Sequence, residues 1–309
     1  MLGATVPVGA DTPTLPSGPS EIIDLWPQGA PGMPMVPPVE DMPERSSNPA
    51  LHDRALMHIA RPRMAVFRPA SPNGGAVLIF PGGSYRYVVV DKEGYELAAW
   101  LAARGVTAFV VFYRLPGDGW AAGPDVALSD AQRAVRLVRQ RAGDFGVDPK
   151  RIGAMGFSAG GHLCADLVTR FDAQTYAVRD AADALSARPA LAALLYPVIS
   201  MAPPIAHAGS REQLIGASAT RALEDAHSPH LHVGKDTPPC FLCAAEDDSA
   251  VPVANSLLFH AALKAANVPA EMHLFAEGGH GFGLRGVVGK PAAIWPTLFL
   301  TWARSQKFL

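Results

Sequence analysis

The pentapeptide GFSAG, residues 156–160, has the residue types and spacing that could most directly carry out covalent chemistry. It follows a strand-like apolar run, 151–157, and precedes a stretch with helical character, 161–170. A G-x-S-x-G pattern between a strand and a helix is typical of a nucleophile elbow, a sharp turn that lifts a serine hydroxyl clear of a sheet. The glycines are needed because side chains at those positions would collide with neighbouring elements. An ordinary glycine-rich turn is the alternative, but the flanking elements favour Ser158 as a nucleophile.

A serine hydroxyl reacts at neutral pH when a base takes its proton and a third group orients that base. In enzymes with a nucleophile elbow, an acid and then a histidine follow the serine, each in a loop after a strand. Glu246, Asp247 and Asp248 follow one strand-like run, and His280 stands among glycines after the next. We predict His280 as the base. Asp248 is favoured as the orienting acid because it begins D-x-x-V-P just before a helix, whereas Asp247 is expected to be solvated or to cap that helix.

Acyl transfer also needs two backbone N–H donors aimed at the developing oxyanion. One donor is expected from Ala159, which follows the nucleophile, and the other from the loop after an early strand. The run VLIFPGGSY, residues 77–85, stands at that place, so the N–H groups of Gly83 and Ser84 are the candidates. Ser84 is not favoured as a nucleophile itself, because no G-x-S-x-G pattern surrounds it and no elbow helix directly follows it.

Four further residues are candidate substrate contacts. Tyr85 and Trp120 have side chains that could stack on a sugar ring or pack in the interior. His162 lies four residues after Ser158 and therefore on the same helix face, although a buried and hydrogen-bonded structural role is favoured. Glu93 either approaches the pocket from behind the oxyanion loop or begins a helix as a favourable N-terminal acid.

The spacing of histidines and cysteines gives little support for a metal site. The stretch HSPHLH places His227, His230 and His232 close together, but no carboxylate stands within it. Cys240 and Cys243 have C-x-x-C spacing inside a strand-like run, with no second pair, so core packing is favoured. We therefore expect neither a metal nor an organic cofactor.

The composition excludes several classes of protein. The chain has 309 residues, 49% of them hydrophobic, so a wholly disordered chain is excluded. The formal net charge is −2 without long runs of one sign, which argues against a nucleic-acid partner. No run approaches the ~18 apolar residues of a membrane span. The first residues lack the basic and apolar regions of a signal peptide, which leaves open a cytoplasmic location and a secreted or periplasmic one with the signal removed.

Strand-like and helix-like stretches alternate from residue 55 onward, which predicts an α/β fold with a mostly parallel sheet covered by helices on both faces. Residues 1–54 are predicted to be an extended arm anchored at 21–27, and 55–309 a single domain. The irregular stretch 200–238 is predicted to be a lid or substrate-binding excursion. The predicted strands are 64–69, 76–80, 107–113, 151–157, 191–197, 240–245 and 271–276, and the predicted helices 94–105, 127–142, 161–170, 253–266 and 296–308.

Several short motifs follow one another along most of the chain: PGGSY, GFSAGGHL, GSREQLIG, SPHL, AAEDDSAVP and GGHGFGL. From about Trp26 to the C-terminus this series resembles α/β-hydrolases of the acetylxylan esterase and feruloyl esterase-like group. The resemblance implies the α/β-hydrolase fold with Ser158, Asp248 and His280 as a catalytic triad. Relatives often have a third glycine where PGGSY has Ser84. The backbone donor survives that change, and the extra hydroxyl is expected to narrow the acyl pocket.

The reaction expected from these residues is hydrolysis of short-chain carboxylic esters through an acyl-enzyme, with a small molecule or an oligosaccharide ester as substrate. The substrate class, acetylated or feruloylated plant carbohydrate, comes from the resemblance alone. A generalist short-chain carboxylesterase and a feruloyl esterase are the nearest alternatives. A peptidase of the prolyl-oligopeptidase type shares the triad order but usually carries an additional domain. A non-catalytic binding protein of the same fold is disfavoured because every triad member is present.

Overall fold

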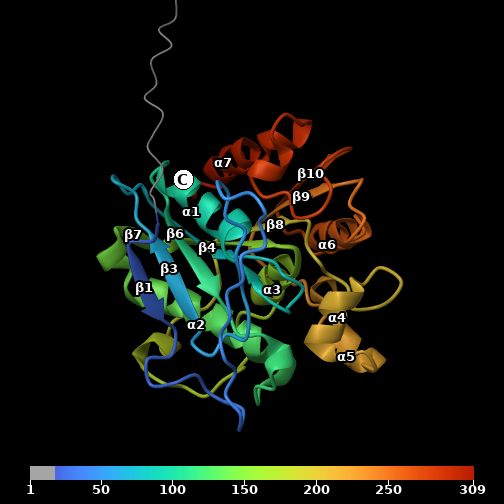
Figure 1. The fold of residues 1–309 in the computed structure, drawn as a ribbon. Coiled ribbons are helices and arrows are strands. Elements are labelled where there is room, and N and C mark those ends of the chain that lie inside the picture. The colour runs from blue at the N-terminus through green and yellow to red at the C-terminus, as the bar shows by residue number, and fades with distance from the viewer. Residues whose placement is uncertain (1–17) are drawn as a thin grey trace, which may run out of the picture.

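The structure, a computed structural model, describes residues 18–309, and within them eight strands form one sheet (Figure 1). In chain order these strands are β1 (Glu21–Asp24), β3 (Arg63–Phe67), β4 (Gly74–Phe80), β6 (Thr107–Phe112), β7 (Val147–Phe157), β8 (Ala192–Leu195), β9 (Cys240–Ala245) and β10 (Ala270–Phe275). Their order across the sheet is β1-β3-β6-β4-β7-β8-β9-β10. From β6 to β10 neighbouring strands are parallel, whereas β1 and β3 are antiparallel at one edge. A separate ribbon pairs β2 (Ala55–Leu56) with β5 (Val88–Val89).

Continuous apolar runs form the middle of this sheet, as expected for parallel strands that are covered on both faces. Every residue of β6, β8 and β9 is buried, and so is every residue of β4 after Gly74. Cys240 and Cys243 lie within β9 as free, buried thiols. Burial raises the pKa of both thiols, which fits core packing better than redox chemistry.

Helices cover both faces of the sheet (Figure 1). They are α1 (Glu96–Ala102), α2 (Val126–Gln140), α3 (Ser158–Thr169), α4 (Ala208–Ile215), α5 (Arg221–Ala226), α6 (Ala254–Ala265) and α7 (Trp295–Ser305). Figure 1 shows α1 and α7 on one side, with α2, α3 and α6 on the other. The helix predicted at 94–105 differs from the structure, because α1 is preceded by a π-helical turn at Asp91–Tyr95. Such turns are frequent at functional sites, and this one buries Glu93.

The segment 18–54 contributes a strand to the sheet, and this strand lies within the stretch 21–27 that is predicted to anchor the arm. Its strand β1 pairs with β3 at the edge of the sheet. After β1, the indole N–H of Trp26 donates a hydrogen bond of 2.6 Å to Asp130 on α2. Asp130 also forms a 2.7 Å ion pair with Arg114, and both side chains are fully buried. Residues 1–17 of the predicted arm lie outside the described residues.

The predicted excursion, 200–238, contains α4 and α5, which lie beside each other at one end of the molecule, apart from α1 and α7 (Figure 1). An ion pair of 2.7 Å between Arg211 and Glu224 joins the two helices. A hydrogen bond joins the start of the excursion to α6, because the Asn255 side chain accepts the backbone N–H of Ile199 at 2.9 Å. The excursion is therefore packed against the domain in this structure.

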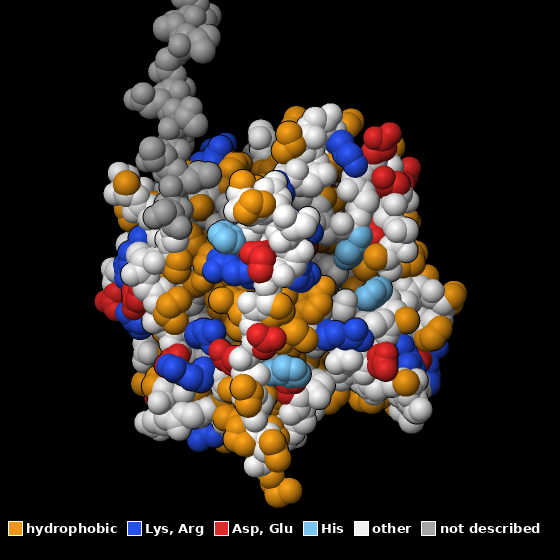
Figure 2. Space-filling model, viewed as in Figure 1, with side chains coloured by type: hydrophobic (Ala, Val, Ile, Leu, Met, Phe, Trp, Pro, Cys, Tyr) orange, Lys and Arg blue, Asp and Glu red, His pale blue; other side chains and the backbone are white. Residues whose placement is uncertain are grey.

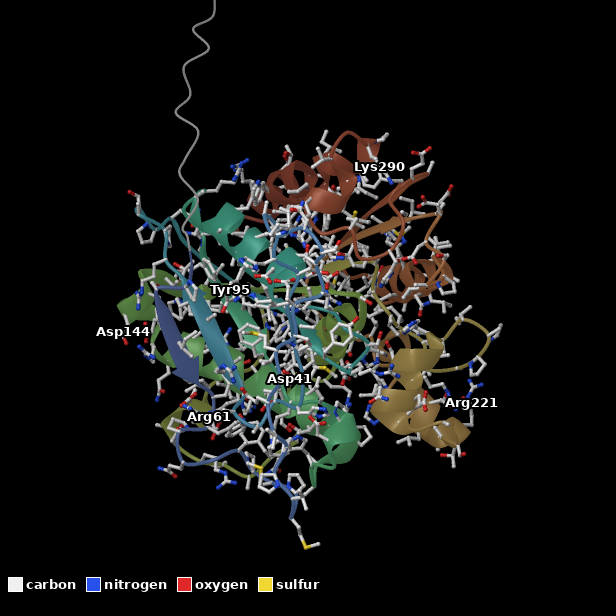
Figure 3. The ribbon with its side chains drawn as sticks, in the orientation of Figure 1. Asp41, Arg61, Tyr95, Asp144, Arg221 and Lys290 are labelled. Atoms are coloured by element: carbon white, nitrogen blue, oxygen red, sulfur yellow. The ribbon has the colours of Figure 1, made fainter. Side chains whose placement is uncertain are left out.

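The surface carries charges of both signs and one apolar projection, visible at the lower edge of Figure 2. Three side chains in the proline-rich part of segment 18–54 are almost fully exposed: Met35, Val36 and Val39. Between residues 18 and 309, no helix combines the length and the apolar character needed to cross a membrane. Figure 3 shows labelled charged side chains at the outside of the ribbon, all exposed: Arg61, Asp144, Arg221 and Lys290.

Candidate active site

The GFSAG turn adopts the geometry that its glycines suggest. β7 ends at Phe157 and α3 begins at Ser158, whose φ angle is +53°. A positive φ is strained for a residue with a side chain and is found where the surrounding structure enforces it. A Cβ added at Gly156 would lie 2.1 Å from the carbonyl oxygen of Gly160. A Cβ at Gly160 would lie 2.0 Å from the carbonyl oxygen of Phe80, so neither position tolerates a side chain.

Ser158, His280 and Asp248 form a continuous hydrogen-bonded chain. His280 Nε2 lies 2.8 Å from Ser158 Oγ, and His280 Nδ1 lies 2.7 Å from Asp248 Oδ2. The serine is 5% exposed, and the Asp248 side chain is 2% exposed. The other Asp248 oxygen accepts the backbone N–H groups of Ala250 at 2.9 Å and Val251 at 2.8 Å. The structure thus brings together the three residues that the sequence predicts as a triad.

The Asp248 carboxylate is held in its charged form. Burial alone would raise its pKa, but the hydrogen bond with His280 and the N–H groups of Val251 and Ala250 outweigh burial. The pKa of Asp248 therefore lies below its usual value. An ionised Asp248 accepts the Nδ1 proton of His280 and leaves Nε2 unprotonated toward Ser158, which is the tautomer that a general base needs.

Asp247 is exposed, as the prediction of a solvated acid has it, and it also has a contact that the sequence did not predict. Its Oδ1 accepts the backbone N–H groups of Gly278 at 2.9 Å and Gly279 at 2.7 Å. These glycines lead directly into His280, and Gly279 and Gly281 have φ angles of +68° and +67°. Asp247 therefore fastens the histidine loop to the end of β9, while its neighbour in the sequence contacts the imidazole.

The PGGSY loop lies directly beside the elbow. A Cβ built on Gly82 would lie 2.9 Å from the Cβ of Ser158. The next residues turn sharply, with φ angles of +137° at Gly83, +58° at Ser84 and +59° at Tyr85. Among the described residues, the N–H groups of Gly83 and Ser84 have no backbone or side-chain acceptor. Two unpaired donors next to a nucleophile are the arrangement that an oxyanion hole requires.

Glu93 lies behind this loop, which is the first of the two positions that the sequence suggests for it, and it does not stand in an open pocket. The side chain is 3% exposed. Its Oε2 accepts the N–H of Gly82 at 2.8 Å, and its Oε1 accepts the hydroxyl of Tyr196 at 3.0 Å. The Tyr196 oxygen in turn accepts the N–H of Gly283 at 3.0 Å, in the loop that carries His280. One buried carboxylate therefore links the loops on the two sides of the nucleophile.

Tyr85, His162 and Trp120 are interior residues, with exposures of 1%, 0% and 3%. This is the structural role favoured for His162, and for Tyr85 and Trp120 it is the packing alternative and not the sugar contact. The Tyr85 hydroxyl lies 2.7 Å from His162 Nδ1, and His162 Nε2 lies 2.8 Å from the carbonyl oxygen of His227. Burial lowers the pKa of His162 to about 4, so the ring is neutral and donates to the carbonyl through Nε2. The guanidinium carbon of Arg114 lies over the ring of Trp120, 4.8 Å from the ring centre. These buried side chains support the active site through packing and hydrogen bonds in the interior.

Sequence reasoning missed Tyr196 and His207. Tyr196 follows β8 with a φ angle of +38°, and its ring centre lies 5.1 Å from that of His280. His207 stands in the excursion at the start of α4, and its Nδ1 accepts the N–H of Ser210 at 3.1 Å. Burial lowers the pKa of His207, and the nearby charge of His280 lowers it further. No local pattern marks these residues, because long-range packing alone brings them to the triad.

Comparison with known proteins shows the family of the chain. A family model described as BD-FAE matches residues 70–263, which is more than half of the chain and includes both the elbow and Asp248. The chain belongs to the BD-FAE family. The α/β-hydrolase fold implied by the motif series is confirmed by the structural neighbours.

Three proteins show what this BD-FAE chain is similar to. An acetylxylan esterase from Xylanibacter ruminicola is 33% identical over 231 residues, covering 72% of this chain and 44% of the relative. An endo-1,4-β-xylanase B from Butyrivibrio fibrisolvens is 37% identical over 205 residues, covering 66% of this chain and 32% of the relative. The crystal structure of an acetyl ester-xyloside bifunctional hydrolase from Caldicellulosiruptor lactoaceticus matches with a TM-score of 0.78 and 34% identity, covering 94% of this chain and 98% of that chain. The chain thus spans less than half the length of these two curated relatives.

Proposed function

We propose that this protein is a serine esterase that removes short acyl groups, acetyl above all, from carbohydrate. The observation that carries the proposal is the chain from Ser158 Oγ to His280 to Asp248, with contacts of 2.8 and 2.7 Å, beside two unpaired backbone donors. Such an arrangement supplies a nucleophile, a base, an orienting acid and an oxyanion hole, which are the parts that acyl transfer needs.

In the proposed reaction His280 Nε2 takes the proton of Ser158 Oγ as the oxygen attacks the ester carbonyl. The C=O bond becomes a C–O⁻ group in a tetrahedral intermediate, and Asp248 stabilises the imidazolium that forms. His280 then gives the proton to the departing alkoxide, which leaves as the alcohol. Water, deprotonated by the same histidine, attacks the acyl-enzyme, and the carboxylic acid departs while Ser158 regains its proton.

The oxyanion hole is proposed to combine the N–H of Ala159 with that of Gly83 or Ser84. Ala159 stands in the first turn of α3, where the helix leaves N–H groups unpaired and the dipole favours negative charge. The removal of one such donor from an oxyanion hole typically costs ~10²–10³ in rate. In this proposal Ser84 acts through its N–H, and its hydroxyl narrows the space for the acyl group.

The substrate class rests on the relatives and on the local shape. Two relatives are named acetylxylan esterase and acetyl ester-xyloside bifunctional hydrolase, and the second aligns over 98% of its own chain. Residues 200–238 are proposed to form one wall of the substrate site, because the excursion begins shortly after Tyr196, whose ring centre lies 5.1 Å from that of His280. We propose a division into the segment 1–54 and the hydrolase domain 55–309, although β1 of the former completes the sheet of the latter.

A panel of substrates tests the proposal: p-nitrophenyl acetate, p-nitrophenyl butyrate, acetylated xylo-oligosaccharide, a feruloyl ester and a peptide anilide, each with wild type and Ser158→Ala. We expect acetate release from the oligosaccharide and from the simple acetate, with a loss of at least 10⁴-fold in Ser158→Ala. Ester hydrolysis without release from the oligosaccharide would indicate a generalist carboxylesterase. Hydrolysis of none of the esters would refute the proposed function.

Ser84→Ala is the matched control for the assignment of the nucleophile. It removes the hydroxyl from the loop beside the elbow and keeps the backbone N–H, so turnover of the acetate should persist. Because the acyl space widens, we expect the ratio of butyrate to acetate activity to rise. Loss of activity in Ser84→Ala with full activity in Ser158→Ala would show that Ser84 is the nucleophile and would refute the assignment to Ser158.

A further inference from the structure

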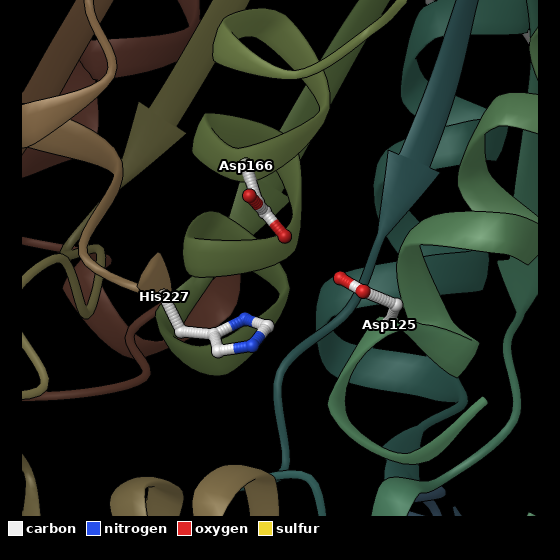
Figure 4. A group of neighbouring side chains, drawn as sticks. All are labelled: Asp125, Asp166 and His227. Atoms are coloured by element: carbon white, nitrogen blue, oxygen red, sulfur yellow. The ribbon is translucent and has the colours of Figure 1, made fainter. Parts of the chain in front are cut away.

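A cluster of two carboxylates and an imidazole lies outside the triad. Asp125, Asp166 and His227 each offer one ligand atom, and these three atoms all lie within 4.8 Å of one another. Figure 4 shows the three side chains pointing toward one another from three separate elements. Asp125 ends the turn before α2, Asp166 lies on α3, and His227 caps the end of α5 in the excursion.

The buried side chain of His227 is the feature that points to a ligand. Its side chain is buried, with the residue 5% exposed, and its Nδ1 has no hydrogen-bond partner among the described residues. A buried polar atom without a hydrogen-bond partner costs free energy, and nearly all such atoms in protein interiors therefore have a partner. Figure 4 shows the ring facing the two carboxylates, yet neither carboxylate lies within hydrogen-bond distance of it. The gap between the groups is therefore too wide for a direct hydrogen bond.

The same gap suits an ion. Oxygen and nitrogen ligands lie about 2.1 Å from Zn²⁺, so two ligands at a tetrahedral angle are about 3.4 Å apart. Ligand atoms within 4.8 Å of one another reach that spacing by small side-chain movements. Two carboxylates and an imidazole form an O₂N set, which suits Zn²⁺ or Mn²⁺ better than Mg²⁺ or Ca²⁺ because the latter prefer oxygen alone. The Asp125 side chain is 35% exposed, which leaves a path from solvent.

Arg170 is the cation that already contacts this cluster. Its guanidinium lies 2.9 Å from Asp125 Oδ1 and 3.2 Å from Asp166 Oδ1. One arginine offsets only one of the two negative charges. A divalent cation would supply the missing charge.

We propose that Asp125, Asp166 and His227 bind one divalent transition-metal ion, of which Zn²⁺ is the best fit, and that the ion clamps the excursion to α3. The clamp reaches toward the active site. Ser158, His162 and Asp166 stand four residues apart and share one face of α3. The carbonyl oxygen of His227 accepts from His162, whose other nitrogen contacts the Tyr85 hydroxyl in the oxyanion loop. Metal bound at His227 therefore orders the excursion without entering the reaction.

Equilibrium dialysis of the untagged, EDTA-treated full chain against Zn²⁺, Mn²⁺, Mg²⁺ and Ca²⁺ tests this site, with metal content measured by mass spectrometry. We expect one equivalent of Zn²⁺ per chain, weaker Mn²⁺ binding and no stoichiometric Mg²⁺ or Ca²⁺. At a hundredfold excess over Kd, Zn²⁺ should raise Tm by about 4 °C. The metal-free enzyme should retain ester hydrolysis, because the ion lies outside the triad.

Variants separate this cluster from other binding modes. His227→Gln and Asp125→Asn should lose the bound equivalent and the Tm increase, and the half-exposed Asp125 gives the variant that is safer for folding. His232→Gln is the matched control, since His232 is exposed in the same stretch, and it should bind normally. Arg170→Gln should bind Zn²⁺ more tightly, because a competing positive charge is removed. Absence of a bound equivalent in wild type, or binding unchanged in both Asp125→Asn and His227→Gln, would overturn the proposal.

Discussion

Substitution of Glu93 by Gln tests the buried link between the two active-site loops. In the native site a carboxylate accepts both the Gly82 N–H and the Tyr196 hydroxyl, at 2.8 and 3.0 Å. Gln has nearly the same shape but a single acceptor oxygen. If that oxygen keeps the Gly82 bond, the amide group faces Tyr196 and leaves its hydroxyl proton without an acceptor.

The expected cost follows from the change in charge. Hydrogen bonds to a charged group contribute about 1.5–3 kcal/mol, and neutral ones about 0.5–1.5 kcal/mol. The charged bond to Gly82 becomes a neutral one, and the charged bond from Tyr196 is replaced by at most a neutral contact from the Gln amide, so the change loses roughly 2–3 kcal/mol in this buried site. If the whole loss falls on the transition state, kcat/KM decreases about 30- to 150-fold. This range overlaps only the lower end of the ~10²–10³ cost of a missing oxyanion donor, as expected for a donor that is displaced and not removed.

The assay is the kcat/KM of p-nitrophenyl acetate hydrolysis, measured together with Tm. Glu277→Gln is the matched control, because Glu277 is an exposed carboxylate near the same histidine loop and should leave both quantities unchanged. We expect the decrease in Glu93→Gln mainly in kcat, since the oxyanion contact strengthens in the transition state. A Glu93→Gln enzyme with the native Tm and native kcat/KM would refute the idea that this carboxylate positions the oxyanion loop.

Three further predictions concern residues that support the site. Burial lowers the pKa of His162 from 6.5 to about 4, so the free energy of unfolding should fall by up to about 3 kcal/mol as pH drops from 6.5 to 4. His162→Asn should lose this part of the pH dependence in urea titrations, and equal pH slopes in both proteins would contradict it. Asp247→Ala leaves two N–H groups of the His280 loop without their acceptor and should lower kcat/KM about tenfold. Asp247→Asn keeps an acceptor oxygen and should keep most of the activity. Equal rates in the two variants would contradict this role of Asp247. Gly160→Ala would place a Cβ 2.0 Å from a backbone oxygen, so we expect loss of soluble folded protein by circular dichroism, and a native, active variant would contradict the packing of the elbow.

Local pattern was sufficient for the framework of the fold. The apolar run 240–245 coincides with β9, because a strand buried on both faces must be apolar throughout. The elbow was predictable since its glycines and serine are contiguous and the backbone conformation demands them. Element ends were less predictable. The helix expected from residue 94 starts with a π-helical turn at 91, and the segment expected as an arm supplies the edge strand β1.

Burial and long-range contacts were not predictable from pattern. Tyr85 and Trp120 have residue types that suit sugar stacking, but tertiary packing encloses them. Glu93 meets Tyr196 across 103 positions of sequence, so no motif could join them. The same reason explains the metal cluster: the sequence drew attention to three neighbouring histidines, whereas His227 faces carboxylates from two distant elements.

The central claim is that Ser158 is the acylated nucleophile. The most direct test treats wild type, Ser158→Ala and Ser84→Ala with a fluorophosphonate and measures intact mass, followed by peptide mapping. We predict one adduct per chain in wild type and in Ser84→Ala, on the peptide that contains Ser158, and none in Ser158→Ala. An adduct on Ser84, or stoichiometric labelling of Ser158→Ala, would contradict the account.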